Sequence, residues 1–202
     1  MSKTVMVVDD EEDIRFIIRN ILEVEGYSVM EAKNGKECIE KLHEKIDLVL
    51  MDIVMPEMDG WDALKKIKGI SKFSSIPVSM LTALPINPNE INDTPFYLLE
   101  NYILKPFTKN QLLEKVNEII NTYSKTDQKA YQLSHSAGHH VSQEYKELTH
   151  VINRYSRLIQ AIIESCGGQG ALPSSMKKAI KGYEEKKQKY MDSLDKLLSG
   201  IS

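Results

Sequence analysis

The first 124 residues alternate short apolar segments with helical patterns, and this alternation constrains the fold more than any other feature of the chain. Segments rich in Val, Ile, Leu or Met predict strands, and a weaker segment ends the series. They cover residues 4–8, 27–31, 47–51, 76–81 and 101–104. Repeated strand–helix units predict an α/β fold with a five-stranded parallel sheet covered by helices on both faces.

Residues at the ends of the apolar segments mark where helices begin. Asp10 is placed to cap a first helix over residues 11–25, and Asn34-Gly35 opens a second one. Asp59 is placed to cap a third helix, and Thr108 with Gln111 forms a capping-box signature for the last. These signals predict helices between the strands, as a doubly wound sheet requires.

The segment between the fourth and fifth predicted strands contains three prolines. Proline inside a helix costs about 3 kcal/mol, so we predict a short helix that starts near Pro88 and is broken near Pro95. Two interpretations stay open. Either the sequence of this loop has changed without functional consequence, or the change has altered the surface that reads out the signal.

Three carboxylates follow two of the predicted strands. Asp9 and Asp10 come directly after residues 4–8, and Asp52 comes directly after residues 47–51. A carboxylate at a strand exit is a nucleophile, a metal ligand or a cap, and the carboxyl ends of parallel strands meet at one edge of the sheet. Three acids there would repel one another unless a cation joined them. The pattern therefore indicates a site built around Mg²⁺ and a phosphoryl group.

The bulk composition narrows the location and the class of partner. Residues 125–202 hold 12 Lys/Arg and 8 Asp/Glu, a net +4, whereas residues 1–124 hold 14 and 21, a net −7. The positive excess of residues 125–202 is too weak to imply DNA binding. Only Cys38 and Cys166 are present, which disfavours a disulfide framework. No signal peptide and no apolar run near the roughly 18 residues of a membrane span are visible. We expect a cytoplasmic protein without membrane association.

A helical extension is predicted after the α/β part. We place the boundary at residues 124–127, which divides the chain into residues 1–124 and 125–202. Apolar residues with 3–4 spacing predict helices over about 127–166 and 174–199, joined by a Gly-rich loop as a helical hairpin. The apolar stripe of the first helix is too wide for one partner helix. We therefore expect a dimeric four-helix bundle, or docking on another protein.

The domain boundary has an alternative interpretation. The 3–4 spacing runs back from Ala137 to Leu112 and then slips by one residue to Val141. Such a slip is a stutter if one helix continues across the boundary. A break at 124–127 fits ordinary helix lengths better, and both interpretations stay open.

The motifs resemble the receiver domain of two-component response regulators, of the kind that chemotaxis regulators represent. They are residues 7–11 (VVDDE), 50–60 (LMDIVMPEMDG), 81–83 (LTA) and 105–107 (KPF). The resemblance covers about residues 3–122 and implies a flavodoxin-like fold. It leaves the C-terminal extension unrecognised.

This resemblance implies that Asp52 accepts a phosphoryl group from a histidine kinase. It implies that Asp9, Asp10, Asp52 and the backbone carbonyl of Val54 hold Mg²⁺, a hard ion that prefers oxygen ligands. Lys105 would place a positive charge on the phosphoryl oxygens.

The resemblance also implies a conformational switch. The hydroxyl of Thr82 would bond the phosphoryl group, and Tyr102 would turn inward in the active state. Pro106 would follow a cis peptide bond. As plainer alternatives, Asp9 caps a helix, Lys105 is an exposed strand-end lysine and Tyr102 is an edge aromatic.

Val54 and Leu84 occupy the positions at which family members carry side chains that can orient water. Valine and leucine cannot do so, and we expect self-hydrolysis over roughly tens of minutes or longer because water activation is weak. Beyond self-phosphorylation and this slow self-dephosphorylation, we expect no enzymatic activity. A metal-dependent phosphatase with an aspartate nucleophile would need a second acid where Val54 stands.

The histidines of the extension leave further functions open. His135 and His139 would share a helix face and could bind a metal, although no cysteine or acid completes a site. His140 has no assigned role. His150 is expected on the solvent side, where a phosphotransfer histidine would have to lie, although its surroundings do not resemble a kinase histidine motif.

A response regulator whose extension controls dimerisation or partner binding is the leading interpretation. A phosphorelay element with a histidine in the extension is the first alternative. A DNA-binding effector is the second, although the extension has no recognisable nucleic-acid motif. The kinase, the signal and the partner cannot be read from the sequence.

Overall fold

The computed structural model describes residues 2–87, 91, 94–167 and 172–201, and the chain forms two compact units. The first unit is Met1–Val116 and the second is Asn117–Ser202. This division follows residue 116, whereas the boundary predicted from the sequence follows residue 124. None of the described helices is both long and apolar enough to cross a bilayer.

The first unit contains the predicted sheet. Five strands pair in parallel in the order β2-β1-β3-β4-β5, and nearly all of their residues are buried or half-buried. They are β1 Thr4–Val8, β2 Ser28–Ala32, β3 Leu48–Met51, β4 Val78–Thr82 and β5 Asn101–Leu104. Val8 pairs with Met51, so β1 and β3 end side by side. The α/β, doubly wound prediction is confirmed.

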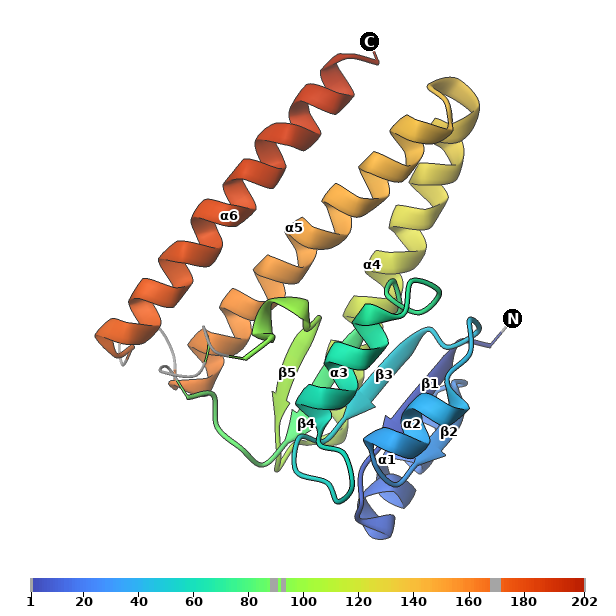
Figure 1. The fold of residues 1–202 in the computed structure, drawn as a ribbon, viewed down its shortest axis with the longest axis vertical. Coiled ribbons are helices and arrows are strands. Elements are labelled where there is room, and N and C mark those ends of the chain that lie inside the picture. The colour runs from blue at the N-terminus through green and yellow to red at the C-terminus, as the bar shows by residue number, and fades with distance from the viewer. Residues whose placement is uncertain (1, 88–90, 92–93, 168–171, 202) are drawn as a thin grey trace. The chain divides into compact units, whose positions relative to one another are not determined.

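Helices cover both faces of this sheet (Figure 1). Helix α2 (Gly35–Lys41) packs against α3 (Gly60–Gly69) on one face. On the other, Lys109 Nζ at the start of α4 (Lys109–Ser136) lies 2.9 Å from Glu25 Oε1, just beyond α1 (Glu12–Val24).

The helix caps predicted at Asn34, Asp59 and Thr108 form, whereas the one predicted at Asp10 does not. Glu11 is the N-cap of α1, and its side chain makes no capping bond. The side chains of Asn34 and Asp59 each accept a bond from the backbone N–H of the third residue of the helix that follows, at 2.9 and 2.8 Å. The Gln111 N–H donates to Thr108 Oγ1, and the Thr108 N–H donates to Gln111 Oε1. The polar residues at these strand-to-helix junctions therefore fix where the helices begin.

Gly60 lets α3 begin against the end of β3. A Cβ atom at this position would lie 2.3 Å from the backbone oxygen of Asp52 and 3.0 Å from Cα of Ile53. No side chain fits there, whereas Gly69 at the other end of α3 has nothing within 4 Å of such an atom.

The predicted fourth helix is not found among the described residues of the segment between β4 and β5. Pro95 is instead the N-cap of a 3-10 helix, η1 (Phe96–Leu98). The expected start near Pro88 lies outside the described residues. Proline lacks an N–H and clashes with the preceding turn, which explains why the described part contains no longer helix.

The predicted break at residues 124–127 is wrong, because α4 runs without interruption from Lys109 to Ser136. No Gly or Pro lies in this stretch. The Thr122 hydroxyl donates to the Glu118 carbonyl at 2.7 Å, and the Thr126 hydroxyl donates to the Thr122 carbonyl at 2.9 Å. Both polar side chains are therefore bonded within the helix and do not interrupt it. The alternative of a continuous helix across the boundary is correct as far as Ser136.

The predicted helix over 127–166 is therefore divided. Gly138 adopts a φ of +93°, a conformation that side chains disfavour, and the chain turns there. Helix α5 (His139–Ser165) follows, so the apparent stutter marks a turn. Helix α6 (Ser174–Ser199) matches the second predicted helix. The second unit contains the two helices of the predicted hairpin together with the C-terminal part of α4.

Helix α5 lies between α4 and α6 in the second unit (Figure 1). Its contacts with α6 are largely apolar, with the Tyr155 ring 5.5 Å from that of Tyr183. The buried residues of this contact include Leu158, Ile162, Met176, Ile180 and Tyr183. The wide apolar stripe predicted for this helix is thus partly covered by α6.

The contacts between α5 and α4 are more polar. Ser142 Oγ donates to the Ala130 carbonyl at 2.6 Å, and Lys146 Nζ lies 2.6 Å from Asp127 Oδ1. The guanidinium of Arg157, with only 3% of its side chain exposed, lies 3.8 Å from Glu118. As the residue numbers rise along α5 they fall along α4, so the two helices are antiparallel.

Candidate functional site

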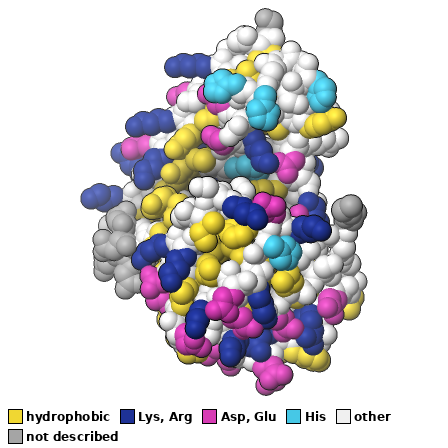
Figure 2. All heavy atoms as spheres, turned by 45° about the vertical axis from the view of Figure 1, so that its right-hand side comes forward, with side chains coloured by type: hydrophobic (Ala, Val, Ile, Leu, Met, Phe, Trp, Pro, Cys, Tyr) yellow, Lys and Arg dark blue, Asp and Glu magenta, His cyan; other side chains and the backbone are white. Residues whose placement is uncertain are grey.

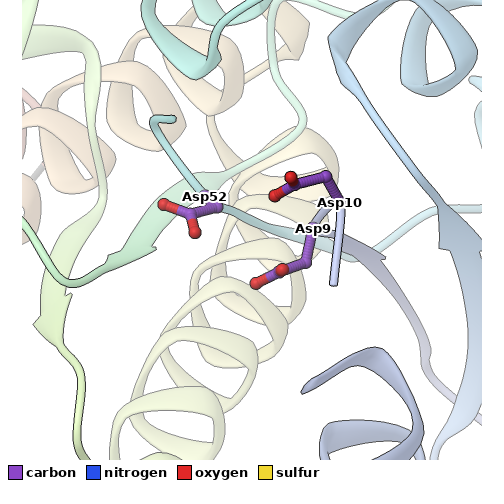
Figure 3. A group of neighbouring side chains, drawn as sticks. All are labelled: Asp9, Asp10 and Asp52. Atoms are coloured by element: carbon purple, nitrogen blue, oxygen red, sulfur yellow. The ribbon is translucent and has the colours of Figure 1, made fainter. Parts of the chain in front are cut away.

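The three predicted carboxylates gather at the carboxyl edge of the sheet. Asp9 and Asp10 follow β1, Asp52 follows β3, and one oxygen from each lies within 4.8 Å of the others. Figure 3 shows the three side chains gathered around one small space. Asp9 is 1% exposed and Asp52 8%, whereas Asp10 is exposed. The pairing of β1 with β3 is what brings these residues together.

Lys105 connects the two buried carboxylates. Its Nζ lies 2.6 Å from Asp9 Oδ2 and 2.7 Å from Asp52 Oδ2. Burial raises the pKa of Asp9, and the hydrogen bond and charge of Lys105 offset this only in part. Burial lowers the pKa of Lys105, but the bonds to Asp52 and Asp9 outweigh it and the net shift is upward. Lys105 is therefore a fixed positive charge, and not an exposed strand-end lysine.

The loop after β3 holds the second oxygen of Asp52. The Ile53 N–H donates to Asp52 Oδ1 at 2.6 Å, and the Val54 N–H reaches the same oxygen at 3.4 Å. Asp9 Oδ1 likewise accepts the Glu11 N–H at 3.0 Å. These bonds orient both carboxylates before any ligand arrives.

Thr82 and Tyr102 meet at Leu84. Thr82, 1% exposed, accepts the Leu84 N–H on Oγ1 at 3.3 Å. The hydroxyl of Tyr102, a side chain only 7% exposed, donates to the Leu84 carbonyl at 2.8 Å. Tyr102 thus points inward, and both predicted switch residues contact the same backbone segment. The Lys105–Pro106 peptide bond is cis, as expected.

The donor set fits a divalent cation. Three carboxylates beside one ammonium group leave an excess of negative charge, and carboxylate oxygens are the ligands that Mg²⁺ prefers. Among the described residues, no other group of three His, Cys, Asp or Glu side chains is close enough to share an ion. Asp9, Asp10 and Asp52 are therefore the residues that could hold one.

Two apolar residues lie beside the site. The side chain of Val54 is 62% exposed, and that of Leu84 is 43% exposed. Neither carries an atom that could orient a water molecule. The edge of the site is therefore hydrophobic at the two positions that the resemblance to receiver domains singled out.

The histidine predictions are corrected by the structure. His135 lies near the end of α4 and His139 begins α5, so the turn at Gly138 removes their expected common helix face. His150 is buried against α4 and not on the solvent side, with its ring stacked 3.9 Å from that of Tyr123. The helical pattern could not show this, because it did not reveal that α4 folds back onto α5.

The hydrogen bond from Tyr102 to the Leu84 carbonyl could not be predicted from the sequence, because every residue has a backbone carbonyl. Trp61 lines a cavity next to Tyr102. Trp61 is the only tryptophan of the chain, and this could have drawn attention to it in the sequence.

Comparison with known proteins adds to this geometry. The response regulator receiver domain model matches residues 5–117. The response regulator SaeR of Staphylococcus epidermidis is 36% identical over 125 residues, which are 60% of this chain and 52% of that protein. SaeR of Staphylococcus aureus is 35% identical over 123 residues, 59% and 51% of the two chains. The chain thus spans about half the length of these curated relatives.

Solved structures resemble the first unit. The response regulator TrrA of Thermotoga maritima, in complex with Mg²⁺–BeF, shares 31% identity with a TM-score of 0.50, covering 58% of this chain and 98% of that one. The chemotaxis protein CheY4 of Vibrio cholerae shares 26% identity with a TM-score of 0.54, covering 59% and 99%. Because the receiver model matches more than half of its 202 residues, the chain belongs to the response regulator receiver domain family.

Proposed function

We propose that this protein is a two-component response regulator that accepts a phosphoryl group from a histidine kinase on Asp52. The observation that carries the proposal is Lys105, whose ammonium group bonds both Asp9 and Asp52 beside a cluster of three carboxylates. Receiver domains of this family typically accept phosphoryl groups on an aspartate. A cytoplasmic location follows from a kinase donor of this class.

The chemistry assigned to Asp52 is nucleophilic. One carboxylate oxygen attacks phosphorus, the P–N bond to the donor histidine breaks, and its electron pair stays on the imidazole nitrogen. Lys105 would stabilise the charge on the phosphoryl oxygens, and the Ile53 N–H holds the carboxylate in position. The aspartates and the Val54 carbonyl would hold Mg²⁺, which supplies further positive charge there when bound.

The proposed switch runs from Thr82 to Tyr102. A phosphoryl group would draw the Thr82 hydroxyl toward it, and the Leu84 N–H that now donates to that hydroxyl would follow. Tyr102 bonds the Leu84 carbonyl, so this movement would shift the balance between its inward and outward positions. The output is dimerisation or partner binding through the helical unit. The protein is a switch and not an enzyme with a separate substrate.

A labelling experiment tests the acceptor. Wild type should take up one phosphoryl group from acetyl phosphate or a kinase with Mg²⁺, and Asp52→Asn should take up none. Asp62→Asn is the matched control, because Asp62 is an exposed acid in the first turn of α3. Label that persists in Asp52→Asn but disappears in His150→Ala would contradict the proposal and favour a phosphorelay.

A further inference from the structure

Arg15 of α1 bonds the backbone of two of the three clustered aspartates. Its Nη1 donates to the Asp9 carbonyl at 2.7 Å and to the Asp10 carbonyl at 3.1 Å. Its Nε lies 3.6 Å from Glu31 Oε1 on β2, and its side chain is only 15% exposed. A guanidinium group presents several N–H donors in one plane and is not deprotonated in proteins. Arg15 therefore links α1 and β2 to the turn that carries Asp9 and Asp10.

The two carbonyl bonds restrict the backbone of Asp10. The carbonyls of Asp9 and Asp10 belong to two successive peptide groups, each of which is planar, and these groups meet at the Cα atom of Asp10. A donor that holds both groups leaves the backbone dihedral angles of Asp10 little freedom. The direction of its Cα–Cβ bond, and with it the place of its carboxylate, is therefore set by Arg15.

Asp10 depends on this support more than the other two aspartates do. The carboxylates of Asp9 and Asp52 are buried, and each accepts a backbone N–H and a bond from Lys105. The Asp10 side chain is exposed, and its carboxylate accepts no hydrogen bond from the residues that the structure describes. It nevertheless lies beside the other two (Figure 3), and the bond from Arg15 to its own carbonyl accounts for this placement.

We propose that Arg15 is a positioning residue of the cation site, because it holds the Asp10 carboxylate beside the other two. The inference rests on the proposed function, which supplies the Mg²⁺. Residues that hold metal ligands from behind typically change metal affinity by about 10–100-fold when they are replaced. Arg15 acts on the ion through the backbone of Asp10 and does not touch the ion itself.

The charge and the bonds of Arg15 have opposite effects on a cation. A positive charge near the site repels the ion, so removal of the charge alone would strengthen binding. Loss of the two carbonyl bonds releases Asp10 and weakens binding. Arg19 is the matched control for charge, because it lies one turn further along α1 and pairs with the other oxygen of Glu31. The sign of the change in affinity therefore separates positioning from electrostatics.

Binding of Mn²⁺ to the full chain tests the proposal, because the electron paramagnetic resonance signal of free Mn²⁺ falls as the ion binds. Wild type should bind one ion, which Mg²⁺ displaces, since both ions prefer oxygen ligands. Arg15→Met should bind Mn²⁺ about tenfold more weakly or worse. Arg15→Lys keeps the charge and one donor group, so its affinity should lie between those two. Arg19→Met should bind as tightly as wild type or more tightly.

Circular dichroism and urea unfolding establish that each variant is folded before its affinity is compared. Affinity in Arg15→Met equal to or above that of wild type would overturn the proposal, as would equal losses in Arg15→Met and Arg19→Met. If Arg15→Met does not fold, Arg15→Lys decides, and an unchanged affinity there overturns the proposal. Failure of the proposed site is visible separately, because wild type itself would then bind no Mn²⁺, and the role of Arg15 would fall with it.

Discussion

At the scale of single residues, Lys105 holds together two carboxylates that would otherwise repel each other in a buried place. The side chains of Asp9 and Asp52 are 2% and 10% exposed, and that of Lys105 is 12% exposed. Neither acid can lose its charge partner without cost, because burial leaves little water to replace it. The same ammonium group also limits how much positive charge a metal ion must supply.

Replacing Lys105 by methionine should lower the free energy of unfolding by about 3 kcal/mol, because a buried ion pair loses one partner. Mg²⁺ should restore much of this loss, since an ion that binds only the folded state stabilises it. Urea unfolding with and without Mg²⁺ measures both effects. The matched control is Lys109→Met, which removes an ammonium group that is 49% exposed and pairs with Glu25 at the surface. A loss that Mg²⁺ does not reduce would contradict the shared role of these carboxylates.

The apolar residues beside the site should govern the lifetime of the phosphorylated state. Val54→Asn places an amide where it can orient water, and we expect the half-life to shorten roughly tenfold or more, as positioned groups often contribute. Decay of bound label after removal of the donor measures it. Val24→Asn, on an exposed valine of α1, should leave decay unchanged. A wild-type half-life of seconds would contradict the explanation.

The sequence predicted which side chains come together at this edge of the sheet, because each stands at the end of a strand or in a motif of fixed spacing. Asp9, Asp10, Asp52 and Lys105 therefore come together once the parallel sheet is assumed. Contacts made by backbone atoms, such as the Leu84 carbonyl with Tyr102, could not be predicted. The burial of His150 was missed because it depends on a helix that approaches from another part of the chain.

At the scale of helices and strands, α4 belongs to both units, since the division between them falls within it. Nothing in its sequence between residues 117 and 130 interrupts a helix, and its apolar residues keep a 3–4 spacing there. The sequence left the choice between a break and a continuous helix open, because average helix lengths favour the break. Tertiary contacts with α5 support the longer helix.

Interrupting α4 should show how much depends on this continuity. Lys125→Pro removes an N–H within the helix and should cost about 3 kcal/mol, with a loss of helical circular dichroism signal. Lys125→Ala is the control, because Lys125 is exposed and alanine favours a helix. If the proline variant kept full helicity and stability, the helix would not be continuous in solution.

The contact between α5 and α6 should give a measurable dependence on pH. Burial raises the pKa of Tyr183 from 10.0 to about 12, with a smaller contribution from Tyr155. The folded state thus binds the phenolic proton more tightly than the unfolded state does. This contribution is complete below pH 10 and is lost as the pH rises toward about 12.

Urea unfolding below pH 10 and between pH 10 and 12 measures this loss. Tyr183→Phe keeps the ring and removes the proton, so the loss should be smaller in the variant. The comparison is needed because the raised pKa of Lys105 affects the same range. An identical pH dependence in both proteins would contradict the assignment to Tyr183.

Strands were predicted within about two residues because buried parallel strands form continuous apolar runs bounded by polar residues. The described residues between β4 and β5 form only the 3-10 helix η1, because prolines in this segment remove N–H groups that a longer helix would need. The break at Gly138 was underestimated because a single glycine is tolerated in many helices. Only its positive φ, which the sequence does not give, decides the turn.

At the scale of the whole molecule, the second unit leaves apolar surface uncovered. Tyr190, Met191 and Leu198 on α6 are 36–37% exposed. On the face drawn in Figure 2, basic and acidic side chains are interspersed. A nucleic-acid partner would select a basic stripe, and this face does not show one. We expect the exposed apolar side chains of α6 to contact a protein partner or a second copy of the chain.

Light scattering of wild type and Asp52→Ala, each with and without Mg²⁺ and a phosphoryl donor, tests the output. We expect the mass of wild type to change on phosphorylation and that of the variant to stay constant, because only wild type can be modified. A donor-dependent change in the variant would contradict a switch that acts through Asp52. A mass that never changes in either protein would point to constitutive assembly and to output by partner docking.

The narrow space at Gly60 has a consequence for how the first unit can vary. The first residue of α3 and the peptide group of Asp52 occupy neighbouring volumes with no room for a methyl group between them. Alanine there would gain about 1 kcal/mol of helix propensity, yet it would have to push the acceptor aspartate out of place. We therefore expect alanine at residue 60 to disturb the geometry of the Asp52 carboxylate, whatever it adds to the stability of α3.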